Sequence, residues 1–496
     1  LIIYKKINIF ITDQNMDDKK KYYIGRKGYS IQKNTLSQTE MHELRNELTV
    51  KPNNSMPGYS SQISYPVYRE STNKLYIPRY FGIEKYGEVS KINISKGEDI
   101  NINFNGSLFD YQINIVNKYM KHIGDSGGGL LDVEPGKGKT VMALNIISKI
   151  KSKTLVVVHK SFLMNQWKER IEQFIPGAKV GFIQGKTIDT EDKDIVIGML
   201  QTLSTKIFSE ELINDFGLTV YDECHHLSAE VFSQVMIRIN TNYTLGLSGT
   251  MTRKDGLTKV FKWFVGPVVH KEKSDAQEEV LIKALYFEDP ENDEYNNVET
   301  DFKGNPQYSK MISKICSNEN RTNMILNVIQ YELKDNYDQQ IMILAHNKSL
   351  IGELFDKTKI FENSVGLYIG GMKDSQLKES ESKKVIIATY AMASEGLDIK
   401  TLTTLCMATP KTDVCQSVGR ILRSKHKRPL VIDIVDNHDI FQRQYNKRKI
   451  YYNKKNYKIQ RYNNLTKYLE NDFSIVPKRE KKQKAQCYIN VADNAF

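Results

Sequence analysis

The stretch LLDVEPGKGKTVMAL, residues 130–144, decides the fold of this chain. A short apolar run leads into a proline and two glycines, and an apolar segment with helical spacing follows. This order predicts a strand, a tight loop and a helix. A strand that feeds a helix through a glycine-containing loop is the context in which a loop binds phosphate.

The loop itself has the residues of a phosphate cradle. Gly136 and Gly138 let backbone N–H groups point inward at β- and γ-phosphate oxygens, and the helix N-terminus adds its positive dipole end. We expect Lys139 to reach the terminal phosphates and the Thr140 hydroxyl to bind Mg²⁺. Val133 replaces the first glycine of the GxxxxGK[ST] pattern, so this motif alone leaves an ordinary glycine turn open. The nucleotide-binding positions expected in this loop are Pro135, Gly136, Lys137, Gly138, Lys139 and Thr140.

A second motif, VYDECHH at 220–226, ends another apolar run. We expect Asp222 to hold Mg²⁺, directly or through water, and Glu223 to orient or deprotonate the attacking water. A helix cap on a charged surface is the alternative, but a preceding phosphate loop favours ATP hydrolysis. His225 and His226 are adjacent residues with no second ligand cluster near them, so we expect no zinc site.

Short apolar runs recur along the chain with helical stretches between them. They are rich in Leu and β-branched residues and do not alternate, which is typical of parallel strands buried on both faces. The runs lie at 128–133, 154–159, 194–199, 218–223 and 244–250, and then at 339–346, 364–370, 384–390, 403–410 and 429–436. The sequence therefore predicts an α/β fold with two parallel-sheet lobes in tandem.

The flanking segments have other compositions. Aromatic and basic residues mix at 65–82, which indicates a small separate α+β or mostly β domain, and an acidic polar stretch at 288–297 indicates a connector. The expected boundaries are 1–105 for an N-terminal accessory domain, 106–275 for the first lobe, 276–320 for the connector, 321–440 for the second lobe and 441–496 for a basic C-terminal extension.

The net charge of +12 is concentrated near the C-terminus. Residues 421–486 hold 18 Lys and Arg against six Asp and Glu, so the rest of the chain is close to neutral. A basic, tyrosine-rich region beside a neutral body suggests a polyanion partner such as nucleic acid. A lysine-rich helix that packs on the second lobe explains the same residues and remains open.

Five scattered cysteines without CxxC pairs fit a reducing compartment, and we expect a cytoplasmic protein. No run approaches the length of about 20 apolar residues that a membrane helix needs. The first residues contain no small-residue cleavage site, so we expect no signal peptide, and Met16 is a candidate start.

In order, the phosphate loop, DECH at 222–225 and LSGT at 247–250 resemble a superfamily 2 helicase of the DExH type. The resemblance spans about 108–436 and implies RecA-like lobes. The other motifs are SLFDYQ at 107–112 (Q-like), VVVHKSFLMNQW at 156–167 (Ia), GMLQTL at 198–203 (Ib/Ic), ILAHN at 343–347 (IV), ATYAMASEGLDI at 388–399 (V) and QSVGRILR at 416–423 (VI). GLSGTMTRKDG is similar to the XPB-like branch, and 65–82 looks like the N-terminal region of poxvirus-type transcript-release helicases of large cytoplasmic DNA viruses.

The resemblance implies further nucleotide-site residues. Gln112 is expected to read adenine, although Phe109 stands where the family usually has Arg. Gly396 and Asp398 of motif V are expected at the nucleotide. Ser248 belongs to motif III, which links the ATP state to the strand channel.

Arg420 and Arg423 of motif VI are expected to act as arginine fingers on the γ-phosphate. Arg suits this role because its planar fork matches phosphate oxygens and stays charged. In comparable phosphoryl-transfer systems such a residue contributes about 10³–10⁵ in rate.

The sequence thus predicts an ATP-dependent translocase or helicase that uses ATP and Mg²⁺. Resemblance to the XPB-like branch implies 3′→5′ movement on DNA, single-stranded or duplex, in viral transcription termination, transcript release or repair. That virus group implies a viral factory or virion. RNA or a transcription complex are further candidate partners, and a monomer is compatible with the sequence. The alternatives are a helicase-like scaffold without motor activity, the motor subunit of a restriction-type complex, and a DEAD-box RNA helicase.

Overall fold

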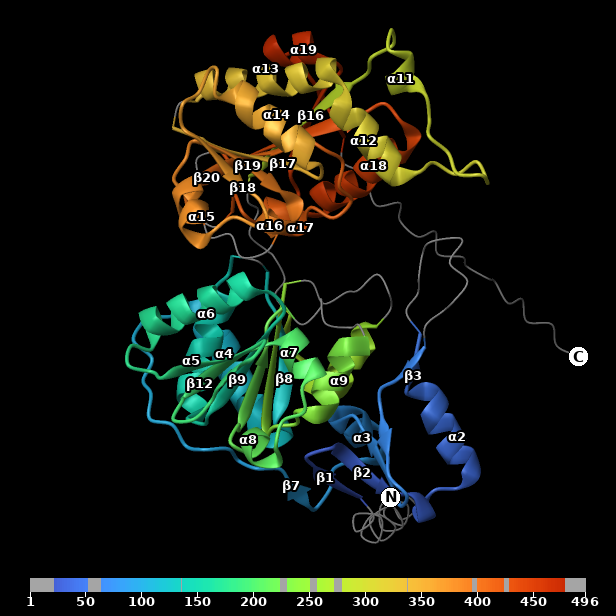
Figure 1. Ribbon diagram of the computed structural model, residues 1–496, viewed down its shortest axis with the longest axis vertical. Coiled ribbons are helices and arrows are strands. Elements are labelled where there is room, and N and C mark those ends of the chain that lie inside the picture. The colour runs from blue at the N-terminus through green and yellow to red at the C-terminus, as the bar shows by residue number, and fades with distance from the viewer. Residues whose placement is uncertain are drawn as a thin grey trace, which may run out of the picture. The chain divides into compact units, whose positions relative to one another are not determined.

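The computed structural model describes residues 22–51, 64–134, 136–223, 230–249, 257–271, 279–336, 338–394, 399–422 and 428–477. The chain divides into two compact units, Leu1–Lys273 and Ser274–Phe496 (Figure 1). Each unit is built on an eight-stranded sheet whose strands are nearly all parallel, which confirms the predicted α/β class and the two lobes.

The first lobe's sheet has the order β11-β10-β12-β9-β13-β14-β8-β15. Only β11 is antiparallel to its neighbour, β10. The strands are β8 (Gly128–Asp132), β9 (Thr154–Val158), β10 (Val180–Gln184), β11 (Thr187–Asp189), β12 (Ile195–Met199), β13 (Leu218–Tyr221), β14 (Tyr243–Ser248) and β15 (Val268–Lys271). The five runs predicted for this lobe form β8, β9, β12, β13 and β14, and these strands are almost wholly buried because helices cover both faces of the sheet.

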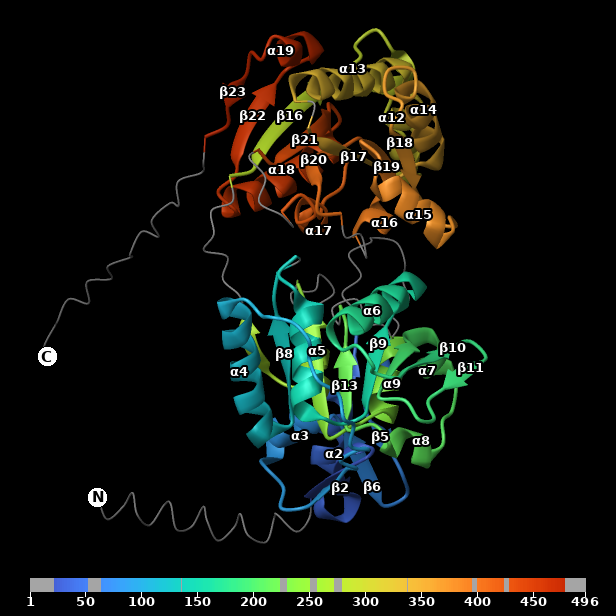
Figure 2. The same ribbon diagram turned by 90° about the vertical axis from the view of Figure 1, so that its left-hand side faces the viewer.

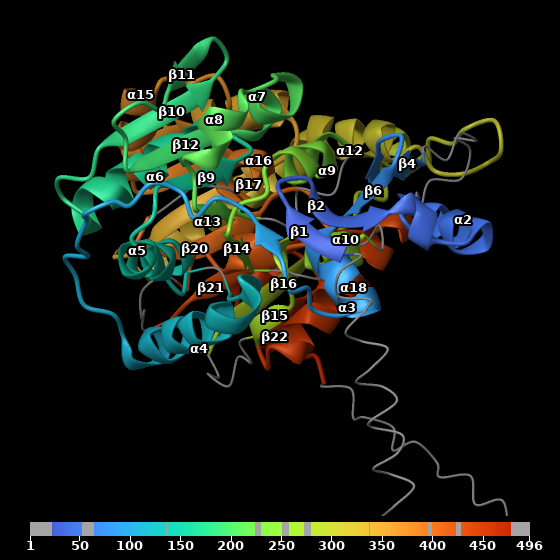
Figure 3. The ribbon, with the colours of Figure 1, turned by 90° about the horizontal axis from the view of Figure 1, so that it is seen from below.

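Two groups of helices enclose this sheet (Figure 3). One face is covered by α4 (Asp110–Ser126), α5 (Lys139–Ile150) and α6 (Ser161–Phe174), and the other by α7 (Leu200–Thr205), α8 (Glu210–Asn214), α9 (Glu230–Arg238) and α10 (Thr258–Val265). Helix α6 illustrates the cause: Leu163, Trp167 and Ile171 recur at four-residue spacing, so they form one buried stripe.

The N-terminal domain has its own antiparallel-rich sheet, ordered β5-β6-β2-β1-β7, and a two-stranded β3-β4 ladder. Its elements are β1 (Tyr22–Gly25), β2 (Gly28–Gln32), the 3-10 turn η1 (Lys33–Thr35), α2 (Gln38–Glu47), β3 (Thr49–Val50), β4 (Tyr65–Pro66), β5 (Arg69–Glu70), β6 (Lys74–Ile77), α3 (Arg79–Tyr86) and β7 (Ile92–Asn93). The domain is not separate, because its core continues into the first lobe. The Phe81 ring packs edge-on against Trp263 at 5.0 Å, and Arg79 donates to the Asn242 carbonyl at 3.0 Å.

The second unit's sheet has the order β18-β19-β17-β20-β21-β16-β22-β23 and is parallel except for β23. Its strands are β16 (Leu281–Phe287), β17 (Gln340–Ala345), β18 (Val365–Tyr368), β19 (Val385–Thr389), β20 (Leu402–Met407), β21 (Leu430–Asp436), β22 (Lys458–Tyr462) and β23 (Ser474–Ile475). Its helices are α11 (Asp293–Asn296), α12 (Tyr308–Ser317), α13 (Glu319–Asp335), α14 (Lys348–Thr358), α15 (Asp374–Glu381), α16 (Tyr390–Ser394), α17 (Cys415–Val418), α18 (Asp439–Lys454) and α19 (Leu465–Leu469). Helices α12, α13, α14 and α19 pack on one face of the sheet, and α16, α17 and most of α18 on the other (Figure 2).

Two predicted boundaries differ from the structure. The segment 276–320, predicted as a connector, supplies β16, which lies between β21 and β22 inside the sheet. The segment 441–496, predicted as a basic extension, supplies most of α18 as well as β22 and α19. Buried ion pairs explain why charged segments enter this core: Arg448 forms a bidentate pair with Asp433, both bonds 2.8 Å long.

Within the described ranges, no helix has both the length and the apolar character needed to cross a bilayer.

Candidate functional site

The predicted phosphate loop joins β8 to α5, which begins at Lys139. Gly136 and Gly138 both adopt left-handed backbone angles, with φ of 84° and 76°. A Cβ at position 138 would also lie 2.4 Å from the side-chain nitrogen of Gln112, so that side chain would have to move. The free N–H groups of the first turn of α5 therefore follow a loop that only glycine can form, as an anion site requires.

Gln112 is buried beside this loop and braces it. Its Oε1 accepts from the Phe109 N–H at 3.0 Å, and its Nε2 donates to the Lys137 carbonyl at 3.0 Å and to the Tyr111 hydroxyl at 3.3 Å. An amide oxygen accepts two bonds, so Oε1 could accept from an adenine amino group without loss of these bonds, whereas a further bond from Nε2 would replace one of them.

Lys139 and Glu223 form the central ion pair of the site. Lys139 Nζ lies 2.6 Å from Glu223 Oε1, and the two side chains are 10% and 22% exposed. Glu223 has a left-handed backbone, with φ of 47°, which is uncommon for a residue with a side chain and marks a constrained position after β13. The structure thus brings together the cation of the phosphate loop and the predicted catalytic carboxylate.

Asp222 is the buried carboxylate of the site. Its Oδ2 accepts from Trp167 Nε1 at 2.9 Å, and its Oδ1 accepts from the Glu223 N–H at 3.0 Å. Burial raises the pKa of Asp222 and the negative charge of Glu223 raises it further, whereas Lys139 and the Trp167 bond lower it. The side chain is therefore oriented from two sides, and its charge is costly unless a cation is near.

Thr140 lies in the first turn of α5, which packs against β13, the strand that ends just before Asp222. A hydroxyl and a carboxylate are the hard oxygen donors that Mg²⁺ binds, usually together with water and substrate phosphates. A divalent cation would also offset the cost of the buried Asp222 charge. The residues present fit the predicted metal.

The end of β8 is tied to the predicted motif III. The Val133 N–H donates to the Ser248 carbonyl at 2.9 Å, and Ser248 is fully buried at the end of β14. The strand that leads into the phosphate loop, β8, is therefore hydrogen-bonded at its end to β14, the strand that carries Ser248.

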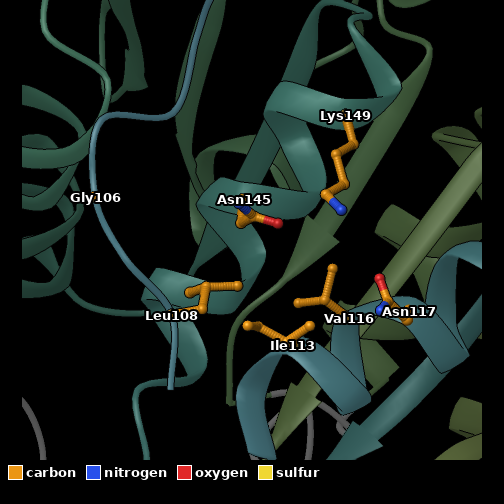
Figure 4. A pocket seen from close by; sticks show the side chains of 7 residues that line it. All are labelled: Gly106, Leu108, Ile113, Val116, Asn117, Asn145 and Lys149. Carbon is orange, nitrogen blue, oxygen red and sulfur yellow. The ribbon is translucent and has the colours of Figure 1, made fainter. Parts of the chain in front are cut away.

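A cavity of about 290 Å³ lies between α4 and α5 (Figure 4). Asn145 on its wall is six residues along α5 from Lys139, which corresponds to about 9 Å of helix rise. The cavity is therefore distinct from the phosphate loop. It is lined by Gly106, Leu108, Ile113, Val116, Asn117, Asn145 and Lys149.

In the second unit, Arg420 lies two residues after α17 and is buried. Its backbone N–H donates to the Ser417 carbonyl at 3.1 Å. Its role as an arginine finger stays a prediction. Several predicted positions lie outside the described residues: Pro135, His225, His226, Thr250, Gly396, Asp398 and Arg423.

Two site residues have no predicted role in the sequence. Trp167 orients Asp222, and Tyr111 donates to the Lys137 carbonyl at 3.2 Å. Both belong to quoted motifs, but only the fold shows their partners. For Trp167 the one available signal is a large polar aromatic on the buried stripe of a helix, since a buried indole N–H needs an acceptor.

Comparisons with known proteins agree with this geometry. Residues 105–253 match the family described as type III restriction enzyme, res subunit. A protein of Acanthamoeba polyphaga mimivirus, named as an ATP-dependent RNA helicase, is 37% identical over 453 residues, 88% of this chain and 86% of its own length. The DNA 3′-5′ translocase XPB2 of Sulfurisphaera tokodaii is 26% identical over 413 residues, 71% of this chain and 89% of its own.

Among solved structures, Saccharomyces cerevisiae Dbp5 bound to RNA and ADP BeF3 has a TM-score of 0.51 at 12% identity, and the match covers 74% of this chain and 96% of that one. At this identity the likeness shows the fold, which is the tandem RecA-like fold predicted from the motifs.

Proposed function

Since the chain belongs to the superfamily 2 helicases, with the mimivirus protein as a relative over most of its length, we propose that it is an ATP-dependent DNA translocase. The observation that supports this function best is the single cluster of Lys139, Glu223 and Asp222 beside the phosphate loop. A scaffold that had lost catalysis would have no reason to keep this set together.

Lys139 and Glu223 exchange partners when ATP binds. Phosphate oxygens attract the Lys139 ammonium away from Glu223 Oε1, now 2.6 Å distant. The released carboxylate is then available to orient or deprotonate the attacking water, the general-base role. The ion pair with Lys139 therefore prevents Glu223 from acting as a base until ATP binds.

Thr140 and Asp222 would hold Mg²⁺, which would neutralise charge on the phosphates. Trp167 keeps the Asp222 carboxylate in a fixed orientation at 2.9 Å. Arg420 and Arg423 are proposed to stabilise the charge that develops on the γ-phosphate.

We favour DNA because of the likeness to the XPB-like branch, whose archaeal member XPB2 is named as a DNA 3′-5′ translocase. RNA is the second candidate, since the mimivirus relative is named as an RNA helicase. The restriction-enzyme match ends at residue 253 and is confined to the first unit, so it reflects a shared motor lobe. We further propose a role in viral transcription termination or transcript release, because residues 65–82 resemble the N-terminal region of poxvirus-type transcript-release helicases.

The test is the rate of ATP hydrolysis with single-stranded DNA, duplex DNA and RNA as stimulants, each at matched nucleotide concentration. Stimulation by DNA alone supports the proposal, and stimulation by RNA alone replaces DNA with RNA as the track. No stimulation by any of the three refutes a nucleic-acid motor.

A further inference from the structure

One face of the N-terminal sheet carries a row of side chains across four neighbouring strands. Tyr23 of β1 is paired with Ser30 of β2, Ser30 with Tyr76 of β6, and Tyr76 with Arg69 of β5. Directly paired residues share a face of a sheet, so these four form one line. We call this row, together with Lys27 and Lys74, the tyrosine face.

The opposite face of the same strands is the hydrophobic one. Ile24, Tyr29, Ile31, Leu75 and Ile77 alternate with the residues of the row and are no more than 1% exposed, packed into the core shared with the first lobe. The tyrosine face is therefore the outer side of the sheet, and Tyr23 and Tyr76 are partly exposed on it.

Two lysines accompany the rings. Lys27 Nζ lies 5.1 Å from the centre of the Tyr76 ring, and Lys74 Nζ lies 5.0 Å from that of Tyr23. Lys74 also donates to the Tyr23 hydroxyl at 3.2 Å. Ser30 lies between the two tyrosines in the row and is buried.

The charge of this face has one sign. Among the described residues of β1, β2, β5 and β6, the sole carboxylate is Glu70, which is paired with Leu75 on the opposite face. Glu70 is also bonded to Arg45 at 2.8 Å and lies 2.7 Å from Lys33. Lys27, Lys74 and Arg69 therefore give the tyrosine face a positive field with no carboxylate of these strands on it.

Partly exposed aromatic rings between cations, without acids, are the features that bind single-stranded nucleic acid: bases stack on the rings and phosphates meet the cations. A patch for a protein partner is usually depleted in lysine at its centre. We propose that the tyrosine face binds single-stranded nucleic acid without sequence preference, with bases on Tyr23 and Tyr76.

This inference rests on the proposed function, and it adds a second contact that belongs to the first unit alone. None of its residues is part of the phosphate loop or of the Asp222–Glu223 pair. Binding at this face is therefore independent of the nucleotide state. It would keep the nucleic acid bound while the contacts made by the motor lobes change with ATP.

The experiment measures the affinity of the whole protein for a fluorescein-labelled oligodeoxythymidylate by anisotropy, over a series of salt concentrations, with and without a non-hydrolysable ATP analogue. Tyr23→Leu/Tyr76→Leu removes both rings and keeps apolar side chains. We expect affinity to fall at least about fivefold for each stacked base lost, equally in both nucleotide states. Tyr23→Phe/Tyr76→Phe keeps the rings and should bind like the wild type.

A second pair of variants tests the cations. Lys27→Gln/Lys74→Gln should reduce the slope of log affinity against log salt by about 1.4, the value for two phosphate contacts on a single strand. Lys85→Gln/Lys91→Gln removes two exposed lysines elsewhere in the same domain and should leave the slope unchanged. Photocrosslinking of a 5-iododeoxyuridine oligonucleotide to the wild type should label Tyr23 or Tyr76, a readout that needs no variant to fold.

Unchanged affinity in a folded leucine variant, or no label on either ring, would overturn the tyrosine face while leaving the motor intact; its partner would then be a protein. If the wild type bound no oligonucleotide and nucleic acid did not stimulate its ATPase, the proposed function itself would be refuted, and this inference with it.

Discussion

Replacing Trp167 with Phe removes the hydrogen bond that orients Asp222 and leaves the other residues of the site unchanged. The indole N–H donates to Asp222 Oδ2 at 2.9 Å, and the ring is 1% exposed. A hydrogen bond to a charged group contributes about 1.5–3 kcal/mol. Loss of part of the buried ring adds to this cost, so we expect a total loss of about 2–4 kcal/mol in the free energy of unfolding.

The effect of this substitution on the pH dependence of ATPase activity has a definite direction. The Trp167 bond lowers the pKa of Asp222, a pKa that burial has raised, so its loss raises the pKa further. Because the ionised carboxylate is the form that binds Mg²⁺, the acid side of the pH–rate profile should move to higher pH. By analogy with residues that orient metal ligands, we expect ATPase activity at fixed Mg²⁺ to fall about 10- to 100-fold and to be partly restored by excess Mg²⁺.

The chain offers a matched control, because it contains two tryptophans. Trp263 in α10 is also buried, 8% exposed, and packs against Phe81 in the N-terminal domain. Trp263→Phe removes the same atoms and should lower stability without changing the Mg²⁺ dependence. ATPase assays across pH and Mg²⁺, with urea unfolding, measure both effects. If Trp167→Phe kept the wild-type Mg²⁺ and pH dependence, the assignment of Trp167 as the orienting residue would be refuted.

Further predictions concern the site and the second unit. Lys139→Ala and Glu223→Gln should each reduce nucleic-acid-stimulated ATPase by about 100-fold or more, since general-base catalysis alone is worth 10²–10⁴; rapid hydrolysis in both variants would contradict the site assignment. Arg448→Met should destabilise the second unit by about 3–5 kcal/mol in urea unfolding, because a buried carboxylate loses its partner; an unchanged midpoint would show that the pair is dispensable. A chain that ends at residue 440 should lose that unit's protease resistance, because β22 and most of α18 are missing, and retained resistance would contradict their structural role. The pKa of Asp222 is raised in the metal-free site, so at limiting Mg²⁺ ATPase activity should fall on acidification at a higher pH than for an ordinary carboxyl, and Asp222→Asn should abolish the activity; an acid limb at the usual carboxyl range at limiting Mg²⁺ would speak against it.

The sequence was sufficient for the strands that are apolar throughout. All ten predicted runs form strands, because a parallel strand buried on both faces needs a continuous apolar run. It was insufficient for β16, where a charged residue is buried by a distant partner, and for β22, where exposed charged residues alternate with buried ones. Lys283 in β16 is 3% exposed and paired at 2.5 Å with Glu332 of α13, a contact that no local pattern reveals.

The same limit applies to the site. Lys139, Asp222 and Glu223 were predictable because each is required by type and position in a motif. The brace formed by Gln112 and Tyr111, and the bond from Trp167 to Asp222 across 55 residues of sequence, depend on how the helices pack. Residues with a predicted chemical role are recognisable from motifs in the sequence, whereas the residues that hold them in place are found in the fold.

The position of β16 sets an order for synthesis. This strand leaves the ribosome before most of its unit, yet both of its neighbours, β21 and β22, are translated more than a hundred residues later. During translation the two edges of β16 therefore stay without their native partner strands, whereas the first unit can already fold. Newly made chains of this protein should depend on chaperones in that interval, and premature stop codons between β16 and β22 should yield a folded nucleotide-binding half attached to an aggregation-prone remnant.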